Sequence, residues 1–134
     1  MKIFLISIII SLTVMLSIDA VWLKTTAKRF YARYIGHLMA ETPNLLAAGV
    51  FYLIYTSTLS VLVIIPAVQG SFSLEKVFFF GATFGLAAYA TYDLTNQATL
   101  KSWPSVVTVV DLLWGALLTG TVSVVTFLLL GVFL

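Results

Sequence analysis

The sequence contains no cysteine and a single histidine, His37. Disulfides, thiolate nucleophiles and cysteine-ligated zinc or iron–sulfur centres are excluded, because each of them needs a thiol. A single histidine also excludes a bis-histidine haem and a histidine-rich metal site.

Charged residues are scarce as well. They make up 9% of the 134 residues, whereas a soluble domain carries about a quarter of its residues as charges. Hydrophobic residues make up 61%, and the mean hydropathy is +1.11. This composition excludes an ordinary globular domain and indicates a chain surrounded by lipid. The net charge of +2 is too small to suggest binding to nucleic acid.

Four apolar runs are long enough to cross a bilayer, which takes about 20 helical residues. The predicted spans, in chain order, are residues 3–23, 44–67, 74–98 and 105–133. The length leaves too little over for a second, soluble domain. The sequence therefore predicts an all-α integral membrane protein, a four-transmembrane-helix bundle in one domain over residues 1–134.

Capping residues and prolines set the helix boundaries. Thr42 and Pro43 suit the N-cap and the first helical position of the second span, and the break that begins at Pro66 ends it. Pro104 ends the third span, because proline cannot continue a hydrogen-bonded turn. A cleaved secretory signal is the alternative interpretation of the first run, but a cut after Ala20 lacks the small residue required three positions from the cut.

The connection between the first two spans is patterned. Its apolar residues recur every three or four positions, and basic residues fill the other face. This pattern predicts a basic amphipathic helix over residues 24–40 that lies on the membrane surface, or a helical extension of the first span. The apolar face includes Phe30, Tyr31, Tyr34 and Leu38.

The distribution of basic residues predicts the topology. The first long connection and the loop before the fourth span share one side, and together they carry Lys24, Lys28, Arg29, Arg33 and Lys101. The other side has only Lys2 and Lys76. Because positive charge favours the cytoplasmic side, we expect both loops in the cytoplasm and both termini outside it.

Three spans each carry one aspartate in their apolar part: Asp19, Asp93 and Asp111. At about 1.5 Å per residue, each lies roughly 8 to 12 Å from the predicted cytoplasmic end of its helix. An aspartate in the membrane costs about 2.5 to 3.5 kcal/mol on insertion scales, so all three should face the bundle interior. They predict a polar pocket near the cytoplasmic face.

Helical spacing places further polar and aromatic side chains near these carboxylates. The candidate pocket consists of Asp19, Trp22, Asn44, Tyr52, Tyr89, Tyr92, Asp93, Asn96, Lys101, Asp111 and Trp114. No cofactor is predicted; a hard divalent cation stays an option, with the three aspartates as its candidate ligands. The structural alternative is that the aspartates only hold the helices together through hydrogen bonds. The pairs Gly81 with Gly85 and Ala116 with Gly120 have the spacing of close helix packing.

The run from Gly81 to Pro104 contains the string Tyr-Ala-Thr-Tyr-Asp-Leu-Thr-Asn. With it, the chain resembles a family of small bacterial predicted membrane proteins catalogued as a domain of unknown function. The other matching features are Asp19 with Trp22-Leu23, Asn44 to Tyr55, Pro66-Ala67, and Asp111 with Trp114-Gly115. The resemblance covers nearly the whole chain and implies a four-helix protein of the bacterial inner membrane, with no agreed activity.

Three functions fit these features. The first is binding of, or catalysis on, a lipid or small amphiphile at the aspartate-lined pocket, with Lys24, Arg29 or Lys101 meeting a headgroup phosphate. The second is a non-catalytic role in a larger membrane complex. The third is transport of protons or a small solute by an oligomer, since three neighbouring carboxylates cannot all carry charge cheaply. Membrane lipids are the expected partners, and no catalytic residue can be assigned.

Overall fold

The computed structural model describes residues 1–133, and these are almost entirely helical. The elements are α1 (Lys2–Trp22), η1 (Leu23–Ala27), α2 (Lys28–Ile35), η2 (Gly36–Leu38), α3 (Leu45–Leu59), η3 (Ser60–Ile64), α4 (Ile65–Gln69), α5 (Leu74–Thr99) and α6 (Ser105–Phe133). The turns η1 and η3 are π-helical, and η2 is a short 3₁₀ turn. Four continuous helices are long and apolar enough to cross a membrane. The predicted all-α membrane bundle is confirmed.

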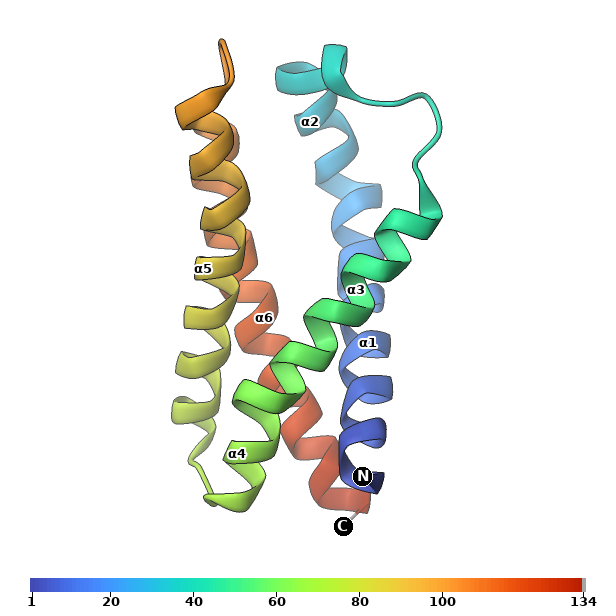
Figure 1. Cartoon of the computed structure of the whole chain (residues 1–134), viewed down its shortest axis with the longest axis vertical. Helices are drawn as coiled ribbons and strands as arrows, with labels where there is room; N and C mark the ends of the chain where they lie inside the picture. The colour runs from blue at the N-terminus through green and yellow to red at the C-terminus, as the bar shows by residue number, and fades with distance from the viewer. Residues whose placement is uncertain (134) are drawn as a thin grey trace.

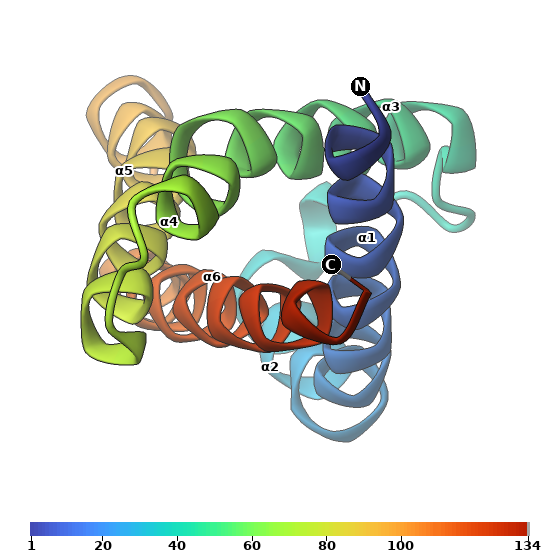
Figure 2. The same cartoon turned by 90° about the horizontal axis from the view of Figure 1, so that it is seen from below.

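The four spans form an open square when seen along the bundle (Figure 2). α5 and α6 lie side by side, α1 packs on the other side of α6, and the α3–α4 helix crosses obliquely opposite α6 (Figures 1 and 2). The connections at residues 39–44 and 100–104 lie at one end, which we call the loop end (Figure 1). The two termini lie at the opposite end (Figure 1).

The α5–α6 contact depends on small residues. A Cβ atom at Gly85 would overlap the carbonyl oxygen of Gly115 and the side chain of Thr119, and one at Gly81 would overlap Ser123. The backbones of the two helices therefore approach closely, as the Gly81–Gly85 spacing predicts. Gly120, which the sequence pairs with Ala116, instead makes room for the ring of Phe78.

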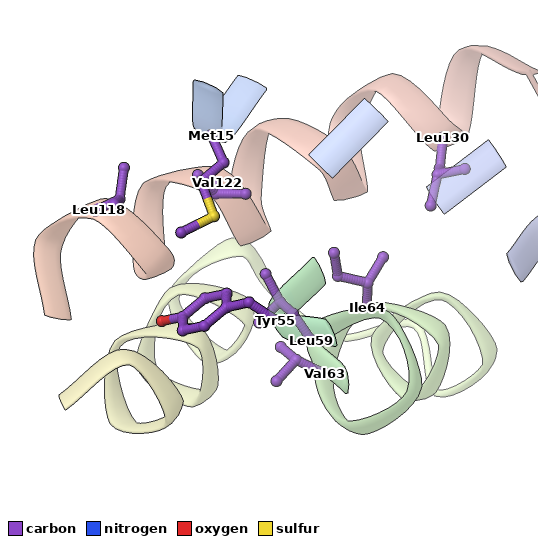
Figure 3. Close-up of a cluster of buried hydrophobic side chains, with 8 residues drawn as sticks. All are labelled: Met15, Tyr55, Leu59, Val63, Ile64, Leu118, Val122 and Leu130. Atoms are coloured by element: carbon purple, nitrogen blue, oxygen red, sulfur yellow. The ribbon is translucent and has the colours of Figure 1, made fainter. Parts of the chain in front are cut away.

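An apolar core joins α1, the α3–α4 helix and α6, between the level of the aspartates and the end of the bundle where the termini lie. It consists of Met15, Tyr55, Leu59, Val63, Ile64, Leu118, Val122 and Leu130 (Figure 3). Two buried polar contacts flank it: Ser7 Oγ donates to Ser60 Oγ at 2.8 Å, and the hydroxyls of Tyr55 and Thr119 lie 2.6 Å apart. These bonds give the hydroxyl groups hydrogen-bond partners, which lipid tails do not provide.

The first span does not stop at residue 23. Helix continues from Lys2 to Ile35, so the basic amphipathic segment extends α1 rather than turning onto the surface. At Ile35 the backbone leaves the helical region (φ −130°, ψ 19°), and the 3₁₀ turn η2 follows and ends before Met39. At about 1.5 Å per residue the rod from Lys2 to Ile35 is roughly 50 Å long, well beyond the apolar thickness of a bilayer at about 30 Å. α2 lies beside the ends of α5 and α6 at the loop end (Figure 1), where Tyr31 donates a hydrogen bond to Asp111 of α6.

The second span differs from prediction at both ends. Its N-cap is Asn44, whose side chain accepts a hydrogen bond from the backbone N–H of Ala47 at 3.0 Å, and not Thr42. The helix also passes through Pro66 and ends only at Gln69. A proline removes one backbone donor and crowds the carbonyl four residues earlier. The π-helical turn just before Pro66 widens the helix at that point and accommodates this mismatch.

Candidate functional site

Asp93 of α5 and Asp111 of α6 lie beside each other where the two helices pack. The side chain of Asp93 is fully buried, and in the described part of the chain, residues 1–133, no donor forms a hydrogen bond with either of its carboxylate oxygens. Asp111 is 7% exposed and accepts a hydrogen bond from the hydroxyl of Tyr31. Two adjacent carboxylates repel each other strongly in an interior of low dielectric constant, so this pair needs a proton or a cation.

Asp19 joins three helices. Its Oδ2 accepts a hydrogen bond from the hydroxyl of Tyr52 on α3 at 2.9 Å, and its Oδ1 accepts one from Nε1 of Trp114 on α6 at 3.3 Å. The ring of Trp114 is stacked on Trp22, one turn after Asp19, with 4.3 Å between ring centroids. Both donors are neutral, so they orient the carboxylate of Asp19 without balancing its charge.

Tyr31 is a site residue that the sequence did not predict as one, and the π-helical turn η1 explains its position. Tyr31 follows Asp19 by twelve residues, which in a regular α-helix would place the two about 120° apart around the axis. A π-helical turn holds one extra residue, which reduces this angle to about 20°. Tyr31 therefore lies on the interior face that Asp19 occupies, together with the buried Ala27.

The aromatic residues around Asp19 line a partly open hollow of about 160 Å³. We call it the acidic aromatic cavity; its lining residues are Asp19, Trp22, Leu23, Tyr31, Tyr52, Tyr89 and Trp114. A Cβ atom at Gly115 would collide with the ring of Tyr89, so this glycine gives the ring its place. Five of the seven lining side chains are aromatic, and the only charged one is a carboxylate.

A second hollow of about 250 Å³ lies between α3 and α5. We call it the lateral cleft; it is lined by Phe51, Tyr55, Ala88, Tyr89, Tyr92 and Asp111. Tyr89 lines both hollows, so the acidic aromatic cavity and the lateral cleft adjoin at this residue. α3 diverges from α5 toward the loop end, where the cleft lies (Figure 1).

Most of the predicted site residues are brought together, and two are not. Asp19, Trp22, Tyr52, Tyr89 and Trp114 line the acidic aromatic cavity. Tyr92 and Asp111 line the lateral cleft, with Asp93 beside Asp111. Asn96 is half-buried on α5, close to one turn beyond Asp93. Asn44 and Lys101 lie outside both hollows: Asn44 is the exposed cap of α3, and Lys101 is exposed in the loop before α6.

Lys101 lies instead at a small groove of the loop end, together with His37 and Trp103. Lys24 and Arg29 are also exposed, on η1 and α2. Within residues 1–133, the buried aspartates interact with tyrosine, tryptophan and one another, and with no lysine, arginine or histidine. The same residues include no group of three carboxylate or imidazole side chains placed to hold a metal ion. The option of one cation held by all three aspartates gains no support.

The fold and the buried polar groups define a multi-pass helical membrane protein. Residues 4–128 match the family model described as predicted membrane protein (DUF2177), and the chain belongs to this family. This confirms the family type inferred from the Tyr-Ala-Thr-Tyr-Asp-Leu-Thr-Asn string. No curated protein and no solved structure matches the chain. The function must therefore be argued from the site itself.

Proposed function

We propose that this protein binds an amphiphile taken from the bilayer, with the polar head in the acidic aromatic cavity and the apolar tail in the lateral cleft. The observation that carries the proposal is the shared wall: Tyr89 lines both hollows, one next to a buried carboxylate and one lined mostly by rings and alkyl groups. Ligand sites in proteins are typically apolar hollows with a few convergent polar groups.

The position of the lateral cleft supports a lipid-soluble ligand. The cleft lies between two membrane-spanning helices, α3 and α5, and each contributes a lining side chain that is exposed at the surface, Phe51 from α3 and Tyr92 from α5. A molecule dissolved in the bilayer could reach Tyr89 from the side. The setting we propose is the cytoplasmic leaflet of a bacterial inner membrane, because the basic residues of α2 lie at the same end as the cleft.

Fluorescence quenching tests the proposal. Trp22 and Trp114 flank the acidic aromatic cavity, and the third tryptophan, Trp103, can be replaced with phenylalanine to remove its signal. In lipid nanodiscs, single-chain amphiphiles with brominated tails should quench the two remaining tryptophans in a saturable manner. Quenching that rises linearly with amphiphile, as for any helix in a bilayer, would contradict the proposal.

Two alanine variants locate the binding. Ala88 lines the lateral cleft, whereas its neighbour Ala87 faces outward. Ala88→Phe should fill the cleft and abolish saturable quenching, and Ala87→Phe, which adds the same ring to the lipid-facing side, should leave it intact. Equal effects of both substitutions would place the ligand elsewhere.

A second candidate function is proton transfer, which one observation favours. Asp93 is buried, has no hydrogen-bond partner and lies beside Asp111. Such a pair can share one proton, and that property is used in proton relays. Liposomes that contain the protein and a pH-sensitive dye would show proton uptake driven by a potential, and Asp93→Asn would abolish it. Four helices hardly enclose a path through the whole membrane, so this function would need an oligomer.

A further inference from the structure

We propose that the head group bound in the acidic aromatic cavity is positively charged, an alkylammonium and preferably a quaternary one. This inference rests on the proposed amphiphile binding and names the class of ligand. The charge of Asp19 is the first feature that supports a cationic head group. Among residues 1–133, Asp19 accepts hydrogen bonds only from Tyr52 and Trp114, both neutral, and the neighbouring acids Asp93 and Asp111 have no basic partner either.

An uncompensated carboxylate is costly away from water. A cationic head group next to Asp19 would supply the missing countercharge, whereas a phosphate or sulfate head group would be repelled. Sites for anionic head groups use arginine or lysine as donors, and the cavity lining contains neither. The phosphate contact suggested by Lys24, Arg29 and Lys101 in the sequence therefore belongs to the membrane surface and not to this cavity.

The second argument is the aromatic lining. The rings of Trp22, Tyr31, Tyr52, Tyr89 and Trp114 all border the cavity. The face of an aromatic ring attracts cations, and tryptophan does so most strongly. Both oxygens of Asp19 already accept hydrogen bonds. A quaternary ammonium suits this lining, because it has no N–H donors to satisfy and needs only ring faces and a nearby negative charge.

The volume of the acidic aromatic cavity is the third feature that supports this head group. A volume of about 160 Å³ equals that of about five water molecules at roughly 30 Å³ each. A compact head of about five heavy atoms, such as trimethylammonium with its first methylene group, fits this space. The tail then leaves past Tyr89 into the lateral cleft.

Three amphiphiles that share one brominated tail test the charge. Their heads are trimethylammonium, its neutral isostere tert-butyl, and sulfate. In the Trp103→Phe protein in nanodiscs, we expect the trimethylammonium compound to show saturable quenching at about tenfold lower concentration than the tert-butyl compound. The sulfate compound should show no saturable quenching. Because the comparison is made on one folded protein, it does not depend on how any site variant folds.

A pair of acid-to-amide variants assigns the effect to Asp19. Asp19→Asn should bring the affinity for the trimethylammonium compound down to that for the tert-butyl compound, which should itself be unchanged. Glu75→Gln removes the same charge from an exposed position at the start of α5, at the opposite end of the bundle, and should change neither.

The outcomes separate the two proposals. If the tert-butyl or sulfate compound binds as tightly as the cation, amphiphile binding stands and the ammonium assignment is wrong. The ammonium assignment is also wrong if Asp19→Asn leaves the preference for the cation intact. If none of the three compounds shows saturable quenching, amphiphile binding itself is wrong.

Discussion

At the scale of single residues, the three membrane aspartates are not equivalent. Asp19 and Asp111 accept hydrogen bonds from tyrosine or tryptophan, whereas the carboxylate of Asp93 accepts none. Removing the charge of Asp93 removes its electrostatic repulsion with Asp111, and no hydrogen-bond donor loses its acceptor. Removing the charge of Asp111 weakens a bond between Tyr31 and a carboxylate that ties α2 to α6.

This asymmetry makes a prediction about stability. Asp93→Asn should leave the free energy of unfolding unchanged or raise it, and Asp111→Asn should lower it by about 1 kcal/mol, the size of an interhelical hydrogen bond in a membrane. Unfolding in mixed micelles with increasing sodium dodecyl sulfate, followed by circular dichroism, measures both. A clear loss of stability in Asp93→Asn would mean that its carboxyl is a structural contact after all.

The sequence located the aspartates correctly on interior faces, because a charge in lipid costs too much to face outward. The sequence does not show that Asn44 and Lys101 lie outside the two hollows, because closeness to a span along the chain does not determine where a side chain points: Asn44 caps a helix and Lys101 lies in a loop. The spacing of Tyr31 indicates only an apolar helix face, and its contact with Asp111 comes from the tertiary structure.

At the scale of helices, the apolar runs predicted the spans, but they contain no sign of the π-helical turn η1. Its residues, Leu-Lys-Thr-Thr-Ala, include neither proline nor glycine. Tertiary contacts before and after η1 explain the turn. Asp19 precedes it and Tyr31 follows it, and both can face the bundle interior only if one extra residue separates them.

Changes in length at η1 test this explanation. Deleting Thr25 should convert the turn to regular α-helix and keep Tyr31 on the face of Asp19, whereas inserting an alanine after Thr25 should rotate Tyr31 away by about 100°. A double-mutant cycle with Tyr31→Phe and Asp111→Asn measures the coupling in each background. We expect the coupling to persist after the deletion and to vanish after the insertion. Loss of the coupling in both length variants would contradict the explanation that the extra residue of η1 keeps Tyr31 on the face of Asp19.

The contact between α5 and α6 makes a second prediction at this scale. Gly85→Ala should destabilise the protein by about 1 to 3 kcal/mol, because the added methyl group overlaps Gly115 and Thr119. The control is Gly49→Ala on α3, where a Cβ atom meets nothing within 4 Å. The same detergent-unfolding assay compares the two, and equal stabilities would show that α5 and α6 can separate without cost.

At the scale of the whole molecule, charge is distributed unevenly between the two ends. The basic residues of η1 and α2 and Lys101 belong to the loop end, and the termini lie at the other (Figure 1). We expect the loop end to be cytoplasmic. Alkaline phosphatase fused to the C-terminus should be active and green fluorescent protein fused there should be dark. The reverse pattern would invert the topology.

The lateral cleft between α3 and α5 has a consequence for how a bound molecule would be supplied. A site that opens sideways draws on molecules dissolved in the membrane, so its occupancy follows their mole fraction among the lipids and not their concentration in water. A compound that is scarce in the cytoplasm but accumulates in the bilayer would then fill the site by diffusion in two dimensions. Compounds of the same charge without a tail would be left out, however abundant they are in solution.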